Sequence, residues 1–218
     1  MNFIHTPMGN FEKKTAEYLL QIKAIKLQPS NPFTWASGWK SPIYCDNRKT
    51  LSFPEVRSYI RDSFCTLIKD LYPKADMIAG VATGAIAHGA LVADKIGLPF
   101  IYVRSGAKEH GLGNQIEGYF EQGQKVVVIE DLISTGGSSL NAVTALRESG
   151  CDVLGMVAIF TYEFKKASDA FAAVNCRLNT LSNYSVLVDT ALNTGYIGQT
   201  EVETLKKWRV DPANWGVK

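Results

Sequence analysis

Several patterns that would mark other classes of protein are missing from this 218-residue chain. It has only four cysteines, which are widely spaced and form no C-x-x-C pair: Cys45, Cys65, Cys151 and Cys176. This spacing favours buried thiols in a reducing compartment over a disulfide framework or a zinc site. The chain also has no long apolar run and no signal-peptide pattern. We therefore expect a cytoplasmic protein without a membrane partner.

Positive and negative charges are also nearly balanced. The chain carries 23 Lys and Arg against 21 Asp and Glu, and no dense basic run. A nucleic-acid-binding protein normally needs a clustered basic face, so we expect no nucleic-acid partner. Two common phosphate-binding motifs are also absent. There is no G-x-x-x-x-G-K-[ST], and the glycines of "GLGNQIEG" have the wrong spacing for a dinucleotide fold.

What the chain does contain, from residue 77 onward, is an alternation of short apolar runs and helical patterns. Strands are predicted at 77–82, 100–104, 125–131 and 153–162, and helices at 85–97, 138–150 and 163–175. Such alternation predicts an α/β fold with a parallel, doubly wound sheet. The length favours one compact unit, so we expect a single domain spanning residues 1–218.

The rest of the chain is less regular. We expect a helix from Phe11 to Ile25 capped by Asn10, a helix from Pro54 to Tyr72, and a closing helix and tail over 205–218. Between the first two lies an irregular stretch, residues 27–53, with the short strand "IYCD". We call this stretch the hood and expect it to cover the sheet. The long connection after "FIYVR" predicts a mobile, functional loop over about 104–116.

The stretch "KVVVIEDLISTGGSS" (Lys125 to Ser139) joins a buried strand to two carboxylates and a turn of small residues. Ligands bind beyond the carboxyl ends of parallel strands, and a helix start rich in Gly and Ser cradles phosphate. The carboxylates Glu130 and Asp131 would then face hydroxyls or a cation, so a ribose phosphate fits both halves. The alternative is that Asp131 only caps a helix and the glycines only close a turn.

This stretch resembles the phosphoribosyl-pyrophosphate signature of the type I phosphoribosyltransferases. Three further segments narrow the resemblance: "FTWASGWKSPIYCDNR" (Phe33 to Arg48), "GVATGAIAHGALVAD" (Gly80 to Asp94) and "YVRSGAKEHGLGNQIEG" (Tyr102 to Gly118). Together they are similar to the orotate phosphoribosyltransferase family. The resemblance implies the type I phosphoribosyltransferase fold, with an N-terminal hood and a mobile loop. It also implies transfer of a phosphoribosyl group to orotate, giving orotidine monophosphate and pyrophosphate in pyrimidine biosynthesis, with Mg²⁺ as cofactor.

The resemblance also implies roles for individual residues. Glu130 and Asp131 would hold the ribose hydroxyls, directly or through water on Mg²⁺. The segment that follows would wrap the 5′-phosphate, and its Ser134 would reach orotate as well: Leu132, Ile133, Ser134, Thr135, Gly136, Gly137 and Ser138. Arg104, Lys108 and His110 would bind the pyrophosphate from the loop. The implied catalytic residues are Arg104, Lys108 and Asp131. The family's loop closes over the neighbouring subunit, so a homodimer is implied.

The sequence departs from part of that family. Ser105, Gly84 and Tyr162 stand where some members carry a second loop lysine, another lysine and an orotate-binding arginine. Lys40 and Arg48 in the hood then become the candidates for the orotate side, with surface solvation as their alternative. His88 and the four tryptophans are interpreted as packing residues, and "GVAT" as backbone that faces pyrophosphate.

Two other functions stay open at this point. A phosphoribosyltransferase for a purine base would share the phosphate and ribose machinery and differ only in the hood. A regulator could keep the phosphoribosyl pocket without catalysis. The basic and imidazole residues of the loop and the absence of an added DNA-binding segment argue against the regulator.

Overall fold

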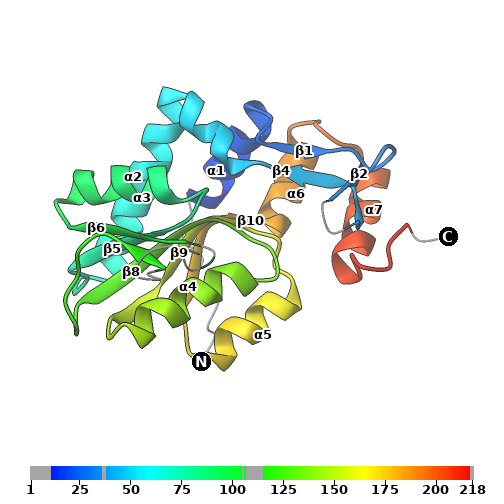
Figure 1. Ribbon diagram of the computed structural model, residues 1–218. Helices are drawn as coiled ribbons and strands as arrows, with labels where there is room; N and C mark the ends of the chain where they lie inside the picture. Colours follow the sequence, from blue (N-terminus) through cyan, green and yellow to red (C-terminus); the bar gives the residue numbers. More distant parts are fainter. Residues whose placement is uncertain (1–10, 36–37, 105, 107–114, 217–218) are drawn as a thin grey trace.

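A computed structural model describes residues 11–35, 38–104, 106 and 115–216. At its centre is a six-stranded sheet with strand order β10-β9-β8-β5-β6-β7 (Figure 1). All neighbours are parallel except β6 and β7, so the predicted parallel α/β sheet is confirmed, with one antiparallel strand added at its edge. The strands are β5 (Met77–Val81), β6 (Phe100–Val103), β7 (Ile116–Glu117), β8 (Lys125–Ile133), β9 (Asp152–Thr161) and β10 (Leu178–Asn183).

Helices cover both faces of this sheet, and Figure 1 shows α2 and α3 on one side and α4 and α5 on the other. The first face also receives α1 and the two C-terminal helices, which share one buried cluster with α2 and α3. The helices are α1 (Phe11–Gln21), α2 (Pro54–Leu71), α3 (Ile86–Ile96), α4 (Gly137–Glu148), α5 (Lys165–Ala173), α6 (Tyr184–Asn193) and α7 (Gln199–Val210). No helix in the described ranges is both long and apolar enough to cross a membrane.

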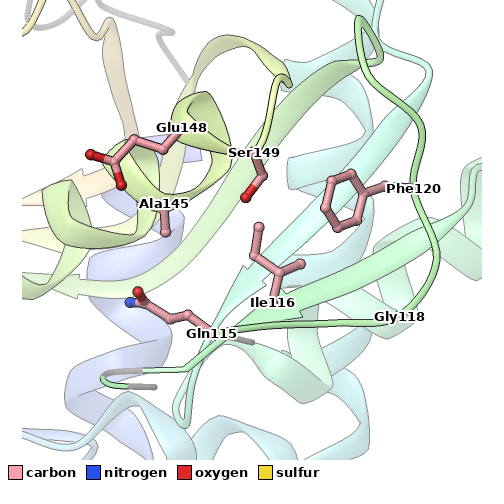
Figure 2. A pocket seen from close by; sticks show the side chains of 7 residues that line it. All are labelled: Gln115, Ile116, Gly118, Phe120, Ala145, Glu148 and Ser149. Atoms are coloured by element: carbon pink, nitrogen blue, oxygen red, sulfur yellow. The ribbon is translucent and has the colours of Figure 1, made fainter. Parts of the chain in front are cut away.

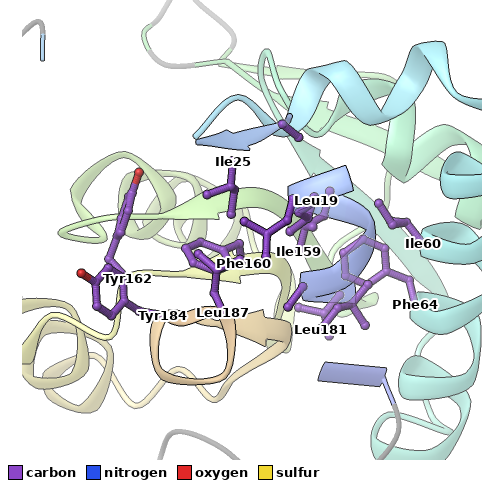
Figure 3. Close-up of a cluster of buried hydrophobic side chains, with 14 of the residues drawn as sticks. Leu19, Ile25, Ile60, Phe64, Ile159, Phe160, Tyr162, Leu181, Tyr184 and Leu187 are labelled. Carbon is purple, nitrogen blue, oxygen red and sulfur yellow. The ribbon is translucent and has the colours of Figure 1, made fainter. Parts of the chain in front are cut away.

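The apolar run of β8 explains how the sheet holds two cores. Val127 and Ile129 belong to the cluster with α1, α2 and α3, whereas Val126 and Val128 belong to the cluster with α4 and α5. All four are fully buried, as a central strand covered on both faces requires. Figure 3 shows the first cluster, where helix side chains such as Phe64 meet Ile159 of β9.

The hood, together with Ile25 and Lys26 just before it, is built from two small antiparallel sheets and a 3₁₀ helix. The paired strands are β1 (Ile25–Leu27) with β4 (Ile43–Cys45) and β2 (Phe33–Thr34) with β3 (Lys40–Ser41), followed by η1 (Asn47–Ser52). The predicted strand "IYCD" is therefore β4. The hood shares the first core, since Ile25, Leu27 and Ile43 belong to the same buried cluster as the sheet residues.

Several predicted boundaries were wrong. The first helix ends at Gln21, because Lys23 adopts a left-handed conformation (φ 55°) and Ile25 begins β1. Strand β8 continues two residues past the carboxylate pair to Ile133, and the C-terminal helix begins at Gln199 rather than at 205. Strand β10 and helix α6 were not predicted at all. The helix cap proposed for Asn10 lies outside the described residues.

Candidate functional site

A cavity of about 410 Å³ lies where β5 and β8 reach their carboxyl ends. Three segments far apart in the sequence line it: residues 81–84 after β5, residues 130–132 at the end of β8, and hood residues Cys45, Asp46 and Arg48. Ser138 of α4 completes the lining. The cavity therefore sits at the sheet edge where parallel α/β folds bind ligands, and it combines segments from three of the four motifs.

The two neighbouring carboxyl groups of β8 have different surroundings. Glu130 is 5% exposed. One of its oxygens accepts the hydroxyl of Ser139 at 2.8 Å and the other accepts the backbone N–H of Asp131 at 2.9 Å. Both oxygens of Glu130 are therefore engaged within the protein. Asp131 is only partly buried, and its carboxyl group lies against Gly84 across the cavity lining.

Burial controls the protonation of this pair. It raises the pKa of Glu130 to about 8, and the charge of Asp131 adds to this rise. Burial also raises the pKa of Asp131, while its hydrogen bonding with Glu130 and the positive charge of Arg48 oppose the rise. Burial of the adjacent carboxyl groups thus favours a proton on Glu130 near neutral pH.

Gly84, where some family members carry a lysine, lies in direct contact with the signature. A Cβ atom added to Gly84 would overlap the Asp131 carboxyl group. A side chain at position 84 would therefore displace the Asp131 carboxyl group. The neighbouring Ala82–Thr83 peptide bond is cis, and both residues line the cavity.

The phosphate cradle was predicted at the start of α4. Its N-cap residue is Gly136, whose left-handed conformation (φ 84°) suits glycine and whose missing side chain leaves room for the ring of Phe171. Since glycine has no side chain to occupy the first-turn N–H groups, this helix start can receive an anion. Ser138 faces the main cavity, while Thr135 lines a smaller cavity of about 220 Å³ beside Trp39.

Within the signature the seven predicted phosphate residues do not play equivalent structural parts. Ile133 is fully buried in the core with α4 and α5, so only its backbone faces the turn. Leu132 lines the main cavity and also packs on the other core. Ser134 lies in the turn, and Gly137 is the first residue of α4. The turn itself is thus brought to the cavity together with the carboxylates.

The two hood cations are placed differently. Arg48 lines the cavity and forms an ion pair with Asp46 at 2.7 Å, with its side chain 62% exposed. Lys40 is not among the residues that line this cavity. It lies in the β2–β3 hairpin, where its ammonium group donates to the hydroxyl of Thr34 at 2.8 Å. The structure therefore brings Arg48, and not Lys40, together with the signature.

The predicted loop leaves the sheet between β6 and β7. Its base is closed by backbone and side-chain hydrogen bonds between Arg104 and Gln115, at 2.9 and 2.8 Å. The guanidinium of Arg104 lies 3.6 Å from the carboxylate of Glu117. Lys108 and His110 lie outside the described residues.

The predicted packing roles of Trp208 and His88 are confirmed, since both side chains are buried. Tyr162, for which no packing role was predicted, is 2% exposed, and its ring packs with Trp35, Phe164 and Trp208, so an aromatic cluster occupies the position of the missing arginine. His88 is 1% exposed and lies 3.0 Å from the hydroxyl of Thr50. Burial lowers its pKa to about 4, so it stays neutral. All four cysteines are free thiols, and three are buried.

Sequence reasoning missed two residues that the structure places at the centre of this site. Cys45 lines the cavity, and buried Asn47 donates to the backbone carbonyl of Asp131 at 2.5 Å. Both lie inside the "YCDNR" segment beside Arg48, so their position was available. Polar neutral side chains give no charge signal, and Asn47 therefore went unremarked.

A second cavity of about 310 Å³ lies between β7 and the end of α4, and Figure 2 shows Gln115 and Glu148 on its two sides. Its lining contains a carboxylate but no Lys or Arg among the described residues. It is therefore less suited to a phosphorylated ligand than the first cavity.

Comparisons with known proteins show the family to which the chain belongs. A family model described as "Phosphoribosyl transferase domain" matches residues 54–195. The orotate phosphoribosyltransferase of Bacteroides fragilis is 60% identical over 208 residues, covering 95% of this chain and 98% of that protein. That of Listeria monocytogenes is 56% identical over 207 residues, covering 95% and 99%. The crystal structure of the Aeropyrum pernix orotate phosphoribosyltransferase matches with a TM-score of 0.73 and 26% identity, covering 84% of this chain and 99% of that chain.

Proposed function

The chain belongs to the family of orotate phosphoribosyltransferases, and from this membership we propose that it transfers the phosphoribosyl group of phosphoribosyl pyrophosphate to orotate. The products are orotidine 5′-monophosphate and pyrophosphate, a step of pyrimidine biosynthesis. The observation that carries the proposal is the position of Asp131, which lines a cavity between a helix N-terminus and the hood. A sugar with a 5′-phosphate fits this pair of features, and the hood leaves room for a base.

The chemistry required of the protein is mainly positioning and charge stabilisation. Departure of pyrophosphate leaves positive charge on the ribose ring, so a carboxylate near the sugar stabilises the transition state. Asp131 supplies this charge, and Glu130 supports it from the buried side. The turn Leu132 to Ser138 binds the 5′-phosphate through its N–H groups and hydroxyls, which fixes the sugar beside Asp131.

The leaving pyrophosphate gains charge as it departs and needs cations. Arg104, Lys108 and His110 are proposed to surround it, with the backbone of residues 81–84 on its other side. The ion pair of Arg104 with Glu117, at 3.6 Å, is long and partly exposed, so the guanidinium can exchange partners at little cost. The loop is proposed to act at the site of a second copy of the chain, in a homodimer.

Mg²⁺ fits this site as an ion carried by the substrate. Among the described residues no group of three or more His, Cys, Asp or Glu side chains is arranged to hold a metal. Mg²⁺ keeps several waters and is commonly bound by one or two carboxylates plus phosphate oxygens. Asp131 would hold it through water, with Glu130 behind, and the bound ion would neutralise charge on the pyrophosphate.

Orotate is proposed to bind between the signature and the hood. Ser134 and Arg48 are the candidates for its polar groups, with Arg48 best placed because it lines the cavity. Lys40 is retained as a weaker candidate, since its ammonium group is bonded to Thr34. A purine base remains the alternative substrate, because the phosphate and ribose residues would be the same.

The direct test is the loss of orotate absorbance when phosphoribosyl pyrophosphate and Mg²⁺ are added to the purified protein. We expect loss that depends on all three components, and no turnover with adenine or hypoxanthine. Turnover of a purine without loss of orotate would replace the base in this proposal. Binding of phosphoribosyl pyrophosphate without any turnover would favour a regulator instead.

The role of the loop can be tested with Lys108→Ala. We expect turnover to fall roughly 100-fold, by the scale of lost electrostatic transition-state contacts, while orotate binding changes little. The measurements are steady-state kinetics and a calorimetric titration with orotate. Lys69→Ala, an exposed lysine of α2, serves as the matched control. Equal and small effects of both substitutions would argue against a pyrophosphate role for Lys108.

A further inference from the structure

A buried asparagine joins the hood and the end of β8, two of the three segments that line the main cavity, and it is linked to α3 as well. Asn47 is 1% exposed and lies between Asp46 and Arg48, both of which line the cavity. Its side-chain N–H donates to the backbone carbonyl of Asp131 at 2.5 Å. Its side-chain oxygen accepts the thiol of Cys45 at 3.2 Å. The side chain therefore uses a donor and an acceptor at once, and each faces a segment of the cavity.

The backbone of Asn47 carries the connection to α3. Its carbonyl accepts the hydroxyl of Thr50 at 2.6 Å, and that hydroxyl lies 3.0 Å from the Nε2 atom of His88. Because Thr50 already donates its hydroxyl hydrogen to Asn47, the neutral His88 must donate from Nε2. His88 belongs to α3, which follows directly on residues 81–84. The network thus reaches from α3 through the hood to β8.

The place where Asn47 meets β8 is where the sheet stops supporting that strand. On the side of β5 the last paired residues are Gly80 and Ile129. From Glu130 onward β8 has a neighbouring strand only in β9, where the pairing continues to Ile133. Asn47 supplies a hydrogen-bond donor to Asp131 at this point. The end of β8, which has a neighbouring strand on one side only, is thus held in place by a side chain from the hood.

The donor and the acceptor of the Asn47 amide cannot exchange places. Burial raises the pKa of the Cys45 thiol well above its usual value, so the thiol keeps its hydrogen and donates to Asn47. The amide oxygen of Asn47 must then be the acceptor, which turns its N–H group toward Asp131. A carboxylate of the same shape at position 47 could still accept from Cys45 but could not donate to Asp131.

We propose that Asn47 is a positioning residue for phosphoribosyl transfer: it holds the backbone at Asp131, and with it the Asp131 carboxylate, in register with the hood. This inference rests on the proposed function. Displacement of a catalytic group by a fraction of an ångström lowers turnover without abolishing the fold. Asn47 therefore ties the sugar-facing carboxylate to the segment that receives the base.

The experiment compares Asn47→Asp and Asn47→Ala with the parent protein. Asn47→Asp replaces the donating N–H group by a charged carboxylate oxygen and keeps the acceptor. Asn47→Ala removes the whole amide and adds no charge. We expect kcat/KM for phosphoribosyl pyrophosphate to fall roughly 10- to 100-fold in both, mostly in kcat. A fall seen only in Asn47→Asp would overturn the proposal, because it would be due to the added charge. Parent-like kinetics in both would overturn it as well.

A matched control distinguishes a positioning role from a purely structural role. Asn183 is also buried, 3% exposed, and its side-chain oxygen accepts the N–H of Val186 at the start of α6, apart from the cavity. Asn183→Ala should lower the unfolding midpoint while leaving kcat at the parent value. If Asn183→Ala lowers kcat as much as the Asn47 variants do for the same loss of stability, the positioning role is wrong.

Two further measurements keep the outcome decisive. If the Asn47 variants do not fold, Thr50→Val removes the hydroxyl that joins the Asn47 carbonyl to His88 and leaves the side-chain bonds of Asn47 in place, and a fall of kcat is expected there. Parent-like kinetics of Thr50→Val would then overturn the network. If the parent does not consume orotate, the proposed function fails, but crystal structures of the parent and of Asn47→Ala still test the link to Asp131. An Asp131 carboxylate in the same position in both structures would then contradict the inference.

Discussion

At the scale of single residues, the most informative feature is that two adjacent carboxyl groups of one strand are treated differently by their surroundings. Glu130 lies inside, bonded to Ser139, and keeps a proton that an exposed glutamate would lose. Asp131 lies at the cavity with Arg48 nearby. Holding a single charge on the outer group lowers the cost of burying the pair. It also places the negative charge where a cationic sugar would develop.

This difference predicts how stability depends on pH. The pKa of Glu130 is raised from 4.5 to about 8, so between these values the folded chain binds a proton that the unfolded chain has lost. The free energy of unfolding contributed by Glu130 therefore falls as pH rises through this window and is level outside it. Glu130→Gln removes the dependence. Relative to the parent, the variant should gain about 1.4 kcal/mol or more between pH 5 and pH 8.5.

Urea denaturation of both proteins at the two pH values, without Mg²⁺, measures this gain. Glu203→Gln serves as the control, because Glu203 is a carboxyl on α7 with 58% side-chain exposure. Its difference from the parent should be the same at both pH values. A constant difference for Glu130→Gln as well would mean that Glu130 is ionised in the folded protein at neutral pH.

Single residues also show which parts of the site could not be predicted from the sequence. The carboxylate pair, the glycines of the turn and Arg48 were predicted, because charge and backbone freedom leave visible patterns. Asn47 was not, because its importance depends on β5 ending before β8 does. Lys40 was proposed from charge alone, and the fold places it in a hairpin outside the cavity lining. Three-dimensional pairing decides such cases.

At the scale of elements, the strands with purely apolar runs were predicted and β10 with α6 were not. Strand β10 reads "LNTLSN", and four of its six residues are polar although all six are buried. Two of these polar side chains bond to distant elements that no local pattern predicts: Asn179 accepts the hydroxyl of Tyr72, and Ser182 donates to a carbonyl of α1. Tertiary hydrogen bonds thus override the expected alternation.

The junction of these two elements carries a testable cap. The side chain of Asn183 accepts the N–H of Val186 at 2.9 Å, which satisfies one of the unpaired donors at the start of α6. Asn183→Ala should lower the free energy of unfolding by about 1 kcal/mol or somewhat more, since the site is buried. Asn193→Ala, at the exposed far end of the same helix, is the control and should change it by less than about 0.5 kcal/mol. Equal effects in denaturant titrations would show that the cap contributes nothing.

At the scale of the whole molecule, the hood and the sheet are joined by shared core and by the C-terminal helix. Trp208 of α7 is fully buried, its indole N–H donates to the carbonyl of Lys40 in the hood, and its ring meets Trp35 and Tyr162. The C-terminal helix therefore connects the hood hairpin to the end of β9. A cavity that uses residues from the hood and from two sheet strands needs such a connection to keep its shape.

We therefore expect the hood and the sheet to unfold as one cooperative unit, as the proposed single domain requires. Tryptophan fluorescence reports on the hood and the C-terminal region, where all four tryptophans lie, whereas far-ultraviolet circular dichroism reports mainly on the sheet and its helices. The two transitions in urea should coincide. Trp208→Ala should shift both together, by about 3–5 kcal/mol, because it leaves a cavity between the hood and β9. A fluorescence transition at lower urea than the dichroism transition would instead mean that the hood is a separate unit. Its link to Asp131 would then be too weak to hold the carboxylate in place.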